Sequence, residues 1–409
     1  MSLKPIKLLK FRPGKNMIFG LLLALMPIVQ PIKSALPVTM SMAIIIILLV
    51  YTLAAIFNHG RISLSGSLFI WMFFLYRIFN HGTSAEELGT SLFVILFSLA
   101  LLNGIFDTRP FFDCISFISC LAAVMIIIQS FCHYIFGFHI CLLRPDLLRD
   151  GISSSGYFAQ ITAQLTTGMS GGIYRPSAFF IEPSAYSLYF IPALCRLIFA
   201  ADDRNSSRWQ AILISLGAVF STSGIGIAVT AALWGFYALR SNLHNGKINV
   251  SRLTILAGVL IITVIIALRF QIVRQSLARI FSAADTSGYS AVQGRLGGGL
   301  IYLSRMDAST LCFGSALSAD ELDIYVSGIF LIILSEGIFG ALLYAAMMIA
   351  IFFSAADEYK VIAAAAIVLV VFAGLYHIHY ITYYFAAILP GCSVRRKSKC
   401  ILPDVKIKW

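Results

Sequence analysis

The chain has 409 residues, of which 59% are hydrophobic and only 12% are charged, and its mean hydropathy is +0.89. This composition excludes an ordinary soluble globular protein, and residues 1–409 are therefore predicted to form a single polytopic membrane domain. The formal net charge of +12 does not indicate nucleic-acid binding, because the basic residues lie in short segments beside apolar runs. There they set the orientation of a membrane protein.

Taken in chain order, a basic N-terminal segment precedes the first apolar run, as in an uncleaved signal anchor, and this places the N-terminus in the cytoplasm. Apolar runs of helical length then recur along the chain. The predicted fold is therefore all-α, a polytopic integral membrane protein with about 12 transmembrane helices. The predicted spans lie near 17–33, 36–57, 63–79, 89–106, 112–138, 184–200, 209–221, 223–239, 253–268, 326–353, 361–376 and 378–390.

Two apolar segments are each predicted to form a hairpin. Residues 209–239, at ~1.5 Å per residue, would as one helix greatly exceed a hydrocarbon core of ~30 Å. A turn at 221–224 keeps the flanking arginines on the cytoplasmic side, and a second hairpin within 361–390 keeps the basic C-terminal segment there too. The run 326–353 is also over-long, and its start is expected to enter from the preceding loop rather than to span.

With both termini inside, two long loops are expected on the extracytoplasmic side, at about 139–183 and 269–325. The basic residues of both loops are all arginine, whereas every lysine of the chain except Lys33 lies on the inner side. A guanidinium offers a planar fork of donors that suits phosphate, so the loops favour an anionic, lipid-linked ligand. Anchoring of the loops to lipid headgroups is the alternative explanation for part of this set.

The segment 173–186 carries the most informative pattern, because it places an arginine and a glutamate directly before an apolar helix. A charge at the edge of a membrane is costly unless it is paired or used, so Arg175 and Glu182 are candidate site residues. Glu182 has two interpretations. It is either a general base that accepts the proton of an acceptor hydroxyl, or it orients Arg175 while Pro183 begins the helix.

Several segments, in this order, resemble the bacterial O-antigen, capsule and exopolysaccharide polymerases of the Wzy type. They are Arg175-Pro176-Ser177 with Phe180-Ile181-Glu182-Pro183-Ser184, Ser221-Thr222-Ser223-Gly224, Gly294-Arg295-Leu296, and Asp323-Ile324-Tyr325 followed by Glu336-Gly337-Ile338-Phe339-Gly340. In architecture the resemblance covers roughly residues 140–390. The chain departs from many relatives at Gly224, where they carry Arg or Lys, and it lacks the His-Asn often found before the exit helix.

The resemblance implies a GT-C-like glycosyltransferase in the bacterial inner membrane, with its active site on the extracytoplasmic face. A growing glycan would move from undecaprenyl diphosphate onto a new lipid-linked repeat unit, so donor and acceptor are both undecaprenyl-diphosphate-linked oligosaccharides. The lipid bilayer and a chain-length regulator are the other candidate partners, and no cofactor, metal or nucleic acid is expected. An O-antigen ligase and a twelve-span lipid-linked oligosaccharide flippase or transporter are the alternatives.

The catalytic candidates are Arg175, Glu182 and Arg295. The leaving group is a lipid diphosphate, and fixed arginines would stabilise the negative charge that develops on it. Because Arg175 and Arg295 come from different outer loops, closure of the loops would assemble a diphosphate clamp. Further residues expected to bind the diphosphate or the glycan are Arg144, Arg279, Tyr325, Glu336, His377 and His379.

Some of these residues have a second interpretation. Glu336 lies within an apolar run and is expected either to pair with an outer-loop arginine or to act in catalysis. His377 and His379, near the outer turn of the last hairpin, either relay protons or pack at the interface. Arg77 is expected to extend along the apolar surface to the outer interface.

Overall fold

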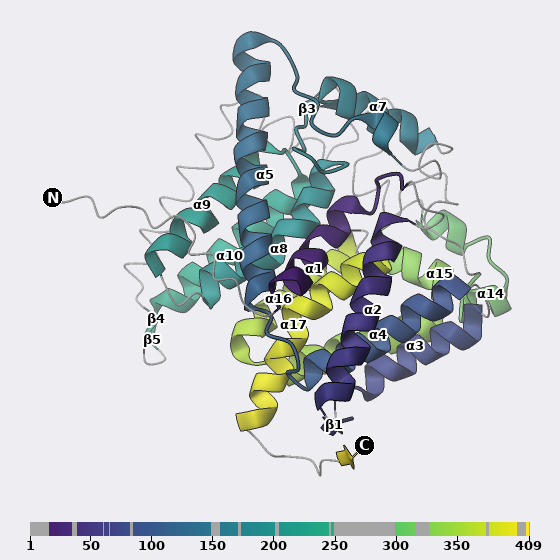
Figure 1. Cartoon of the computed structure of the whole chain (residues 1–409). Helices are drawn as coiled ribbons and strands as arrows, with labels where there is room; N and C mark the ends of the chain where they lie inside the picture. Colours follow the sequence, from purple (N-terminus) through teal and green to yellow (C-terminus); the bar gives the residue numbers. More distant parts are fainter. Residues whose placement is uncertain are drawn as a thin grey trace. The chain divides into compact units, whose positions relative to one another are not determined.

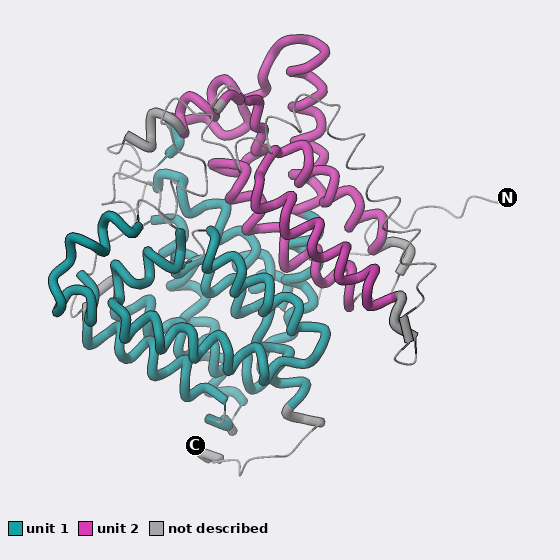
Figure 2. The backbone as a smooth tube through the Cα atoms, turned by 180° about the vertical axis from the view of Figure 1, so that it is seen from behind, with its two compact units in different colours: residues 1–117, 146–158, 295–409 teal, residues 118–145, 159–294 magenta. Residues whose placement is uncertain are grey.

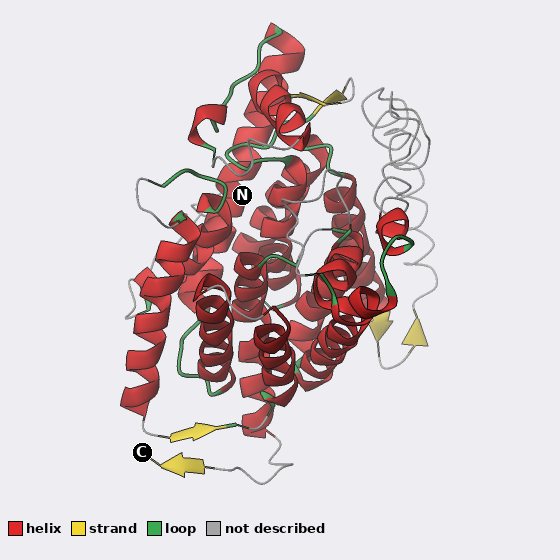
Figure 3. Cartoon of the chain, turned by 90° about the vertical axis from the view of Figure 1, so that its right-hand side faces the viewer, coloured by secondary structure: helices red, strands yellow, loops and turns green. Residues whose placement is uncertain are grey.

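The protein is described from a computed structural model (Figure 1). The structure describes residues 16–34, 39–59, 61–64, 66–81, 85–148, 156–170, 173–200, 204–244, 247–248, 299–315, 327–373, 376–398 and 406–408. These residues are mostly helical, and their strands form three short antiparallel pairs (Figure 3). The predicted all-α class is therefore confirmed for the described part of the chain.

A helix lies at each predicted span except 253–268, which is outside the described residues. The helices are α1 (Met17–Val29), α2 (Met40–His59), α3 (Leu68–His81), α4 (Ala85–Leu102), α5 (Arg109–Phe136), α8 (Pro183–Phe199), α9 (Arg204–Phe220), α10 (Gly224–Asn242), α15 (Gly328–Ser354), α16 (Asp357–Phe372) and α17 (Ile378–Ser398). Among them α2, α5 and α15 are long and apolar enough to cross a membrane, and α1, α3 and α4 supply shorter apolar segments.

Both predicted hairpins are present. α9 ends at Phe220 and α10 begins at Gly224, so the turn falls at the predicted Ser/Thr segment. The turn closes locally, because the amide of Ser221 donates to the carbonyl of Gly217 and its hydroxyl donates to that of Ala218, both within the preceding helical turn. The second hairpin separates α16 from α17, and the two helices pack against each other.

The over-long run 326–353 is one element with a break in it. α15 follows Ser327, but Gly337 has φ 71° and ψ −179°, which no helical residue adopts. Glycine reaches this conformation at little steric cost. The first nine residues of α15 are thereby separated from the rest of the helix, while the entry of this start from the preceding loop without spanning stays a prediction.

The described parts of the two long loops that were predicted to lie outside also contain regular structure. The first loop holds a short 3-10 helix η1 (Pro145–Leu147), α7 (Gly156–Thr167) and the hairpin of β2 (Met169–Ser170) with β3 (Ile173–Tyr174). In the second loop α14 (Ala308–Phe313) is capped by Asp307, which accepts from the amides and hydroxyls of Ser309 and Thr310. These hydrogen bonds hold the pKa of Asp307 well below its usual range.

The other strand pairs lie near the ends of helices. β1 (Arg61–Ser63) pairs with β6 (Lys406–Lys408), and β4 (Leu243–His244) pairs with β5 (Lys247–Ile248).

The chain divides into two compact units (Figure 2). Unit 1 comprises Met1–Phe117, Asp146–Phe158 and Arg295–Trp409, and unit 2 comprises Ile118–Pro145 and Ala159–Gly294. Within unit 1, α15 packs against α3, α14 and α16, while α17 packs against α1, α4 and α16. Within unit 2, α8 packs against α9 and α10, and it is buried without interruption from Pro183 to Cys195.

The predicted orientation can be tested with a native thiol in the first outer loop. Cys141 is exposed, and so is Val394 beside the predicted cytoplasmic end. In a variant that keeps only Cys141, an impermeant maleimide should label intact cells or spheroplasts. In the matched variant whose single thiol is Val394→Cys, it should label only after lysis. Labelling of Cys141 only after lysis would show that the topology is inverted.

Candidate functional site

In unit 2 the segment that carries Arg175 forms a compact turn before α8. The backbone amide of Arg175 donates to the carbonyl of Gly168 at 2.6 Å, which extends the β2–β3 hairpin by one bond. The turn then closes on itself, because the amide of Phe180 donates to the carbonyl of Ser177 and the hydroxyl of Ser177 donates to the carbonyl of Phe180, both at 2.9 Å. Arg175 is half-buried.

Glu182 is the N-cap residue of α8. Its backbone is extended, Pro183 occupies the first helical position, and the hydroxyl of Ser184 donates to its carboxylate. The interpretation of 182–184 as a helix start is therefore confirmed. Glu182 thus lies where an α-helix presents unpaired backbone amides and the positive end of its dipole, a position that suits an anion.

Two segments that carry the polymerase resemblance lie next to each other in unit 2. The hydroxyl of Thr222, in the turn between α9 and α10, donates to the carbonyl of Tyr174 at 3.3 Å. From the same turn, the hydroxyl of Ser223 lies 2.8 Å from that of Ser187 in α8. The Ser/Thr turn therefore contacts the residue before Arg175 and a residue in α8, the helix that follows Glu182.

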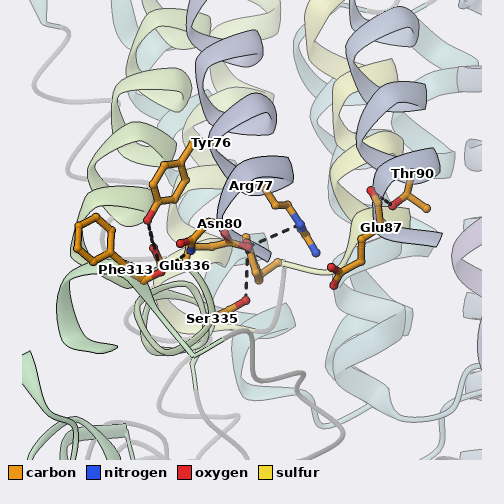
Figure 4. A network of polar contacts seen from close by, with 9 residues as sticks. Tyr76, Arg77, Asn80, Glu87, Thr90, Phe313, Ser335 and Glu336 are labelled. Atoms are coloured by element: carbon orange, nitrogen blue, oxygen red, sulfur yellow. Dashed lines mark hydrogen bonds and ion pairs between the residues drawn. The ribbon is translucent and has the colours of Figure 1, made fainter. Parts of the chain in front are cut away.

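In unit 1 the break of α15 holds a buried charge. Glu336, which directly precedes Gly337, is 0% exposed. Its Oε1 accepts a hydrogen bond from the hydroxyl of Tyr376 and another from Ser335 at 3.4 Å. The same oxygen lies 3.7 Å from Nε of Arg77 in α3, as the dashed line in Figure 4 marks.

Arg77 is the residue that sequence reasoning misjudged. An arginine that reached to the interface would be exposed, but the Arg77 side chain is 16% exposed and forms an ion pair with Glu336. Its guanidinium also lies over the ring of Tyr376, 5.7 Å from the centroid. Among the described residues its Nε and Nη1 have no hydrogen-bond partner. The sequence could have indicated this pair, because an arginine and a glutamate that each lie alone in an apolar run are candidates to form an ion pair.

The backbone at this break is held by side chains of α3. Tyr76 donates from its hydroxyl to the carbonyl of Glu336 at 2.8 Å, and the amide of Asn80 donates to the carbonyl of Phe313 at the end of α14 (Figure 4). A break in an apolar helix leaves backbone groups unpaired, and each needs a partner inside the protein. Here Tyr76 and Asn80 of α3 are the hydrogen-bond partners of the backbone carbonyls of Glu336 and Phe313.

The other predicted site residues have different surroundings. His377 and His379 precede or begin α17, with ring centroids 5.4 Å apart and planes at 16°, and His379 is buried. Arg144 is exposed, immediately before η1. Arg279, Arg295 and Tyr325 lie outside the described residues, so the two-loop arginine clamp stays a prediction.

Comparison with known proteins gives no further identification. No protein-family model and no curated protein matches the chain.

The buried ion pair predicts a strong energetic coupling. Arg77→Met alone leaves the buried Glu336 carboxylate without its counter-charge and should cost about 3–5 kcal/mol of unfolding free energy in mixed micelles, whereas Glu336→Gln should cost less because Glu87 also attracts Arg77. The double variant should lose less than the sum of the two single variants.

The control for this cycle is Arg109→Met, since Arg109 pairs with Asp107 at 3.9 Å in an exposed position. It should cost at most about 1 kcal/mol. Strict additivity of Glu336→Gln and Arg77→Met would show that the two side chains are not coupled.

Proposed function

We propose that this chain is a polysaccharide polymerase of the bacterial inner membrane, with both termini in the cytoplasm. It would transfer a growing glycan from undecaprenyl diphosphate onto a new lipid-linked repeat unit at the extracytoplasmic face. The observation that carries the proposal is made in unit 2, where Thr222 binds Tyr174, the residue before Arg175, and Ser223 contacts Ser187 of α8, the helix that Glu182 caps. It brings together, at the head of one buried helix, two of the segments on which the resemblance to Wzy-type polymerases rests.

The chemistry of this segment suits the reaction. The bond between the anomeric carbon of the donor glycan and the diphosphate oxygen breaks, the diphosphate keeps the electron pair, and the acceptor hydroxyl oxygen bonds to that carbon. The guanidinium of Arg175, in the segment that leads into α8, would stabilise the charge on the departing diphosphate. The hydroxyl proton of the acceptor goes to a base, for which Glu182 is the carboxylate at hand. In the alternative role, Glu182 orients Arg175 and the proton passes to solvent.

A lipid-linked oligosaccharide flippase or transporter is the second candidate, and one observation favours it. Substrate sites of secondary transporters are often built from discontinuous helices. α15 is interrupted at Gly337, beside the buried charges of Glu336 and Arg77. An O-antigen ligase shares the transferase chemistry and differs in its acceptor.

Deletion of the gene distinguishes these functions by the surface glycan that remains. Loss of a polymerase should leave a glycan of one repeat unit, because flipping and attachment continue without it. Surface glycan that is missing altogether would contradict the polymerase and indicate a ligase or a flippase. The measurement is the electrophoretic ladder of surface polysaccharide, with the wild-type gene restored as the control.

The role of Arg175 predicts an effect of geometry as well as charge. Arg175→Lys keeps the charge but loses the bidentate fork, so it should be nearly as impaired as Arg175→Ala. A lost contact to the leaving group costs on the order of 2–4 kcal/mol of barrier, or roughly 30- to 1,000-fold in rate. The measurement is polymerisation of purified lipid-linked repeat units by the reconstituted protein.

Arg305→Lys is the control for this series, because Arg305 is an exposed arginine of the other predicted outer loop and is not among the residues expected to bind the substrate. It should retain activity. Full activity of Arg175→Lys would contradict the role of the guanidinium in stabilising the leaving group.

A further inference from the structure

Tyr174, the residue before Arg175, is held at the ring, the hydroxyl and the backbone carbonyl. It is 2% exposed, and its ring stacks on His133 of α5 with centroids 3.8 Å apart and planes at 5°. Its hydroxyl donates to the carbonyl of Gln129 at 3.0 Å and lies 2.8 Å from Nδ1 of His139. With Thr222 bound to its carbonyl, Tyr174 contacts α5, the first outer loop and the α9–α10 turn.

His139 joins this tyrosine to the end of α7. Burial lowers the pKa of His139, and neighbouring His133 lowers it further although the hydrogen bond to Leu165 opposes the shift, so the imidazole is neutral at pH 7. Its Nε2 lies 3.0 Å from the carbonyl of Leu165, in the last turn of α7, and must therefore carry the proton. With Nδ1 then an acceptor, the single hydroxyl hydrogen of Tyr174 is shared between Nδ1 of His139 and the carbonyl of Gln129, and burial raises the pKa of this hydroxyl.

Gln129 of α5 holds the chain on both sides of Arg175. Its backbone carbonyl accepts from Tyr174, and its side-chain Oε1 accepts from the backbone amide of Ala178 at 3.0 Å. Its Nε2 donates to the carbonyl of Ile140 at 2.7 Å, so the side chain is used at both ends. Tyr174 and Ala178, which flank residues 175–177, are thus both hydrogen-bonded to Gln129 of α5.

The backbone beyond Arg175 depends on these bonds. Ala178 has φ 52°, a left-handed conformation that is uncommon for residues other than glycine and costs on the order of 1–3 kcal/mol. Such a residue persists only where its surroundings hold it, and here Gln129 binds its amide. On the other side, Gly168 has φ 71°, and a Cβ there would clash with the rings of Tyr174 and His139.

We propose that Gln129, His139 and Tyr174, here called the Tyr174 clamp, are positioning residues that fix the backbone of 174–178 so that Arg175 is presented in one place. On either side of Arg175, the clamp holds the side-chain hydroxyl of Tyr174 and the backbone amide of Ala178. What Arg175 then does rests on the proposed function, in which it stabilises a diphosphate leaving group. The alternative is that the same contacts only add stability to unit 2.

The first test removes the hydroxyl of Tyr174 and keeps its ring. Tyr174→Phe should raise hydrogen exchange of the segment 173–180 about 10-fold or more, because the segment opens more easily without the bond from Tyr174 to Gln129, and opening frees the amides of Arg175 and Ala178 from Gly168 and Gln129. The matched control is Tyr186→Phe, the same change at a fully buried tyrosine of unit 2 whose hydroxyl lies 3.4 Å or more from its acceptors. It should leave that segment protected. Unchanged exchange in Tyr174→Phe would overturn the clamp.

The second test separates positioning from stability. In the polymerisation assay Tyr174→Phe should lower kcat about 10- to 100-fold with little change in KM, since a displacement of about 1 Å costs that much in an oriented site. In an Arg175→Ala background the same substitution should cause no further loss, because the clamp acts through Arg175. A further loss of similar size in that background would overturn positioning in favour of general stability.

The two tests also separate this proposal from the proposed function. If Arg175→Ala is fully active while Tyr174→Phe still loosens 173–180, the clamp stands and the role of Arg175 in glycosyl transfer fails. If Arg175→Ala is inactive and Tyr174→Phe loosens the segment with full activity, positioning by the clamp is overturned and the proposed function stands.

Discussion

The constraint on which the rest of this structure depends is the lack of water to satisfy polar groups inside an apolar helical protein. Every interrupted backbone and every buried charge must find a partner within the chain. At the break of α15 the carbonyl of Glu336 is bound by Tyr76 and its carboxylate by Tyr376, with Arg77 supplying the counter-charge. The same requirement is met in unit 2, where Gln129 accepts hydrogen bonds from the hydroxyl of Tyr174 and the amide of Ala178, on either side of Arg175.

Charged and polar side chains are therefore gathered in two regions of the protein, which its apolar composition alone would not predict. In unit 2 the segment from Arg175 to Glu182 leads into the buried helix α8, and the Ser/Thr turn binds Tyr174 before this segment and Ser187 after it. In unit 1 an ion pair lies beside an interrupted helix. The first arrangement suits stabilisation of a departing diphosphate, whereas the second is also found where transporters bind their substrates. This is why transfer and transport are the functions to be separated by experiment.

Local sequence patterns were sufficient for most of the helical architecture. The length of the apolar runs against the thickness of a bilayer predicted the α9–α10 and α16–α17 hairpins, and Pro183 marked the start of α8. The excess length of 326–353 likewise indicated a separate first segment, and Gly337 supplies the break. Each of these features depends on a few consecutive residues, so no knowledge of distant contacts was needed.

The sequence by itself thus determined the class and the main helices, and it marked Arg175, Glu182 and Glu336 as charges at costly positions. Only the tertiary structure decided which groups meet. The partner of Arg77 comes from α15, far along the chain, and no local pattern distinguishes an arginine that reaches the interface from one that turns toward a buried carboxylate. Gln129, His139 and Tyr174 carry no charge or motif that marks them. Their role follows from packing, because hydrogen bonds between α5 and the outer loop exist only once the chain has folded.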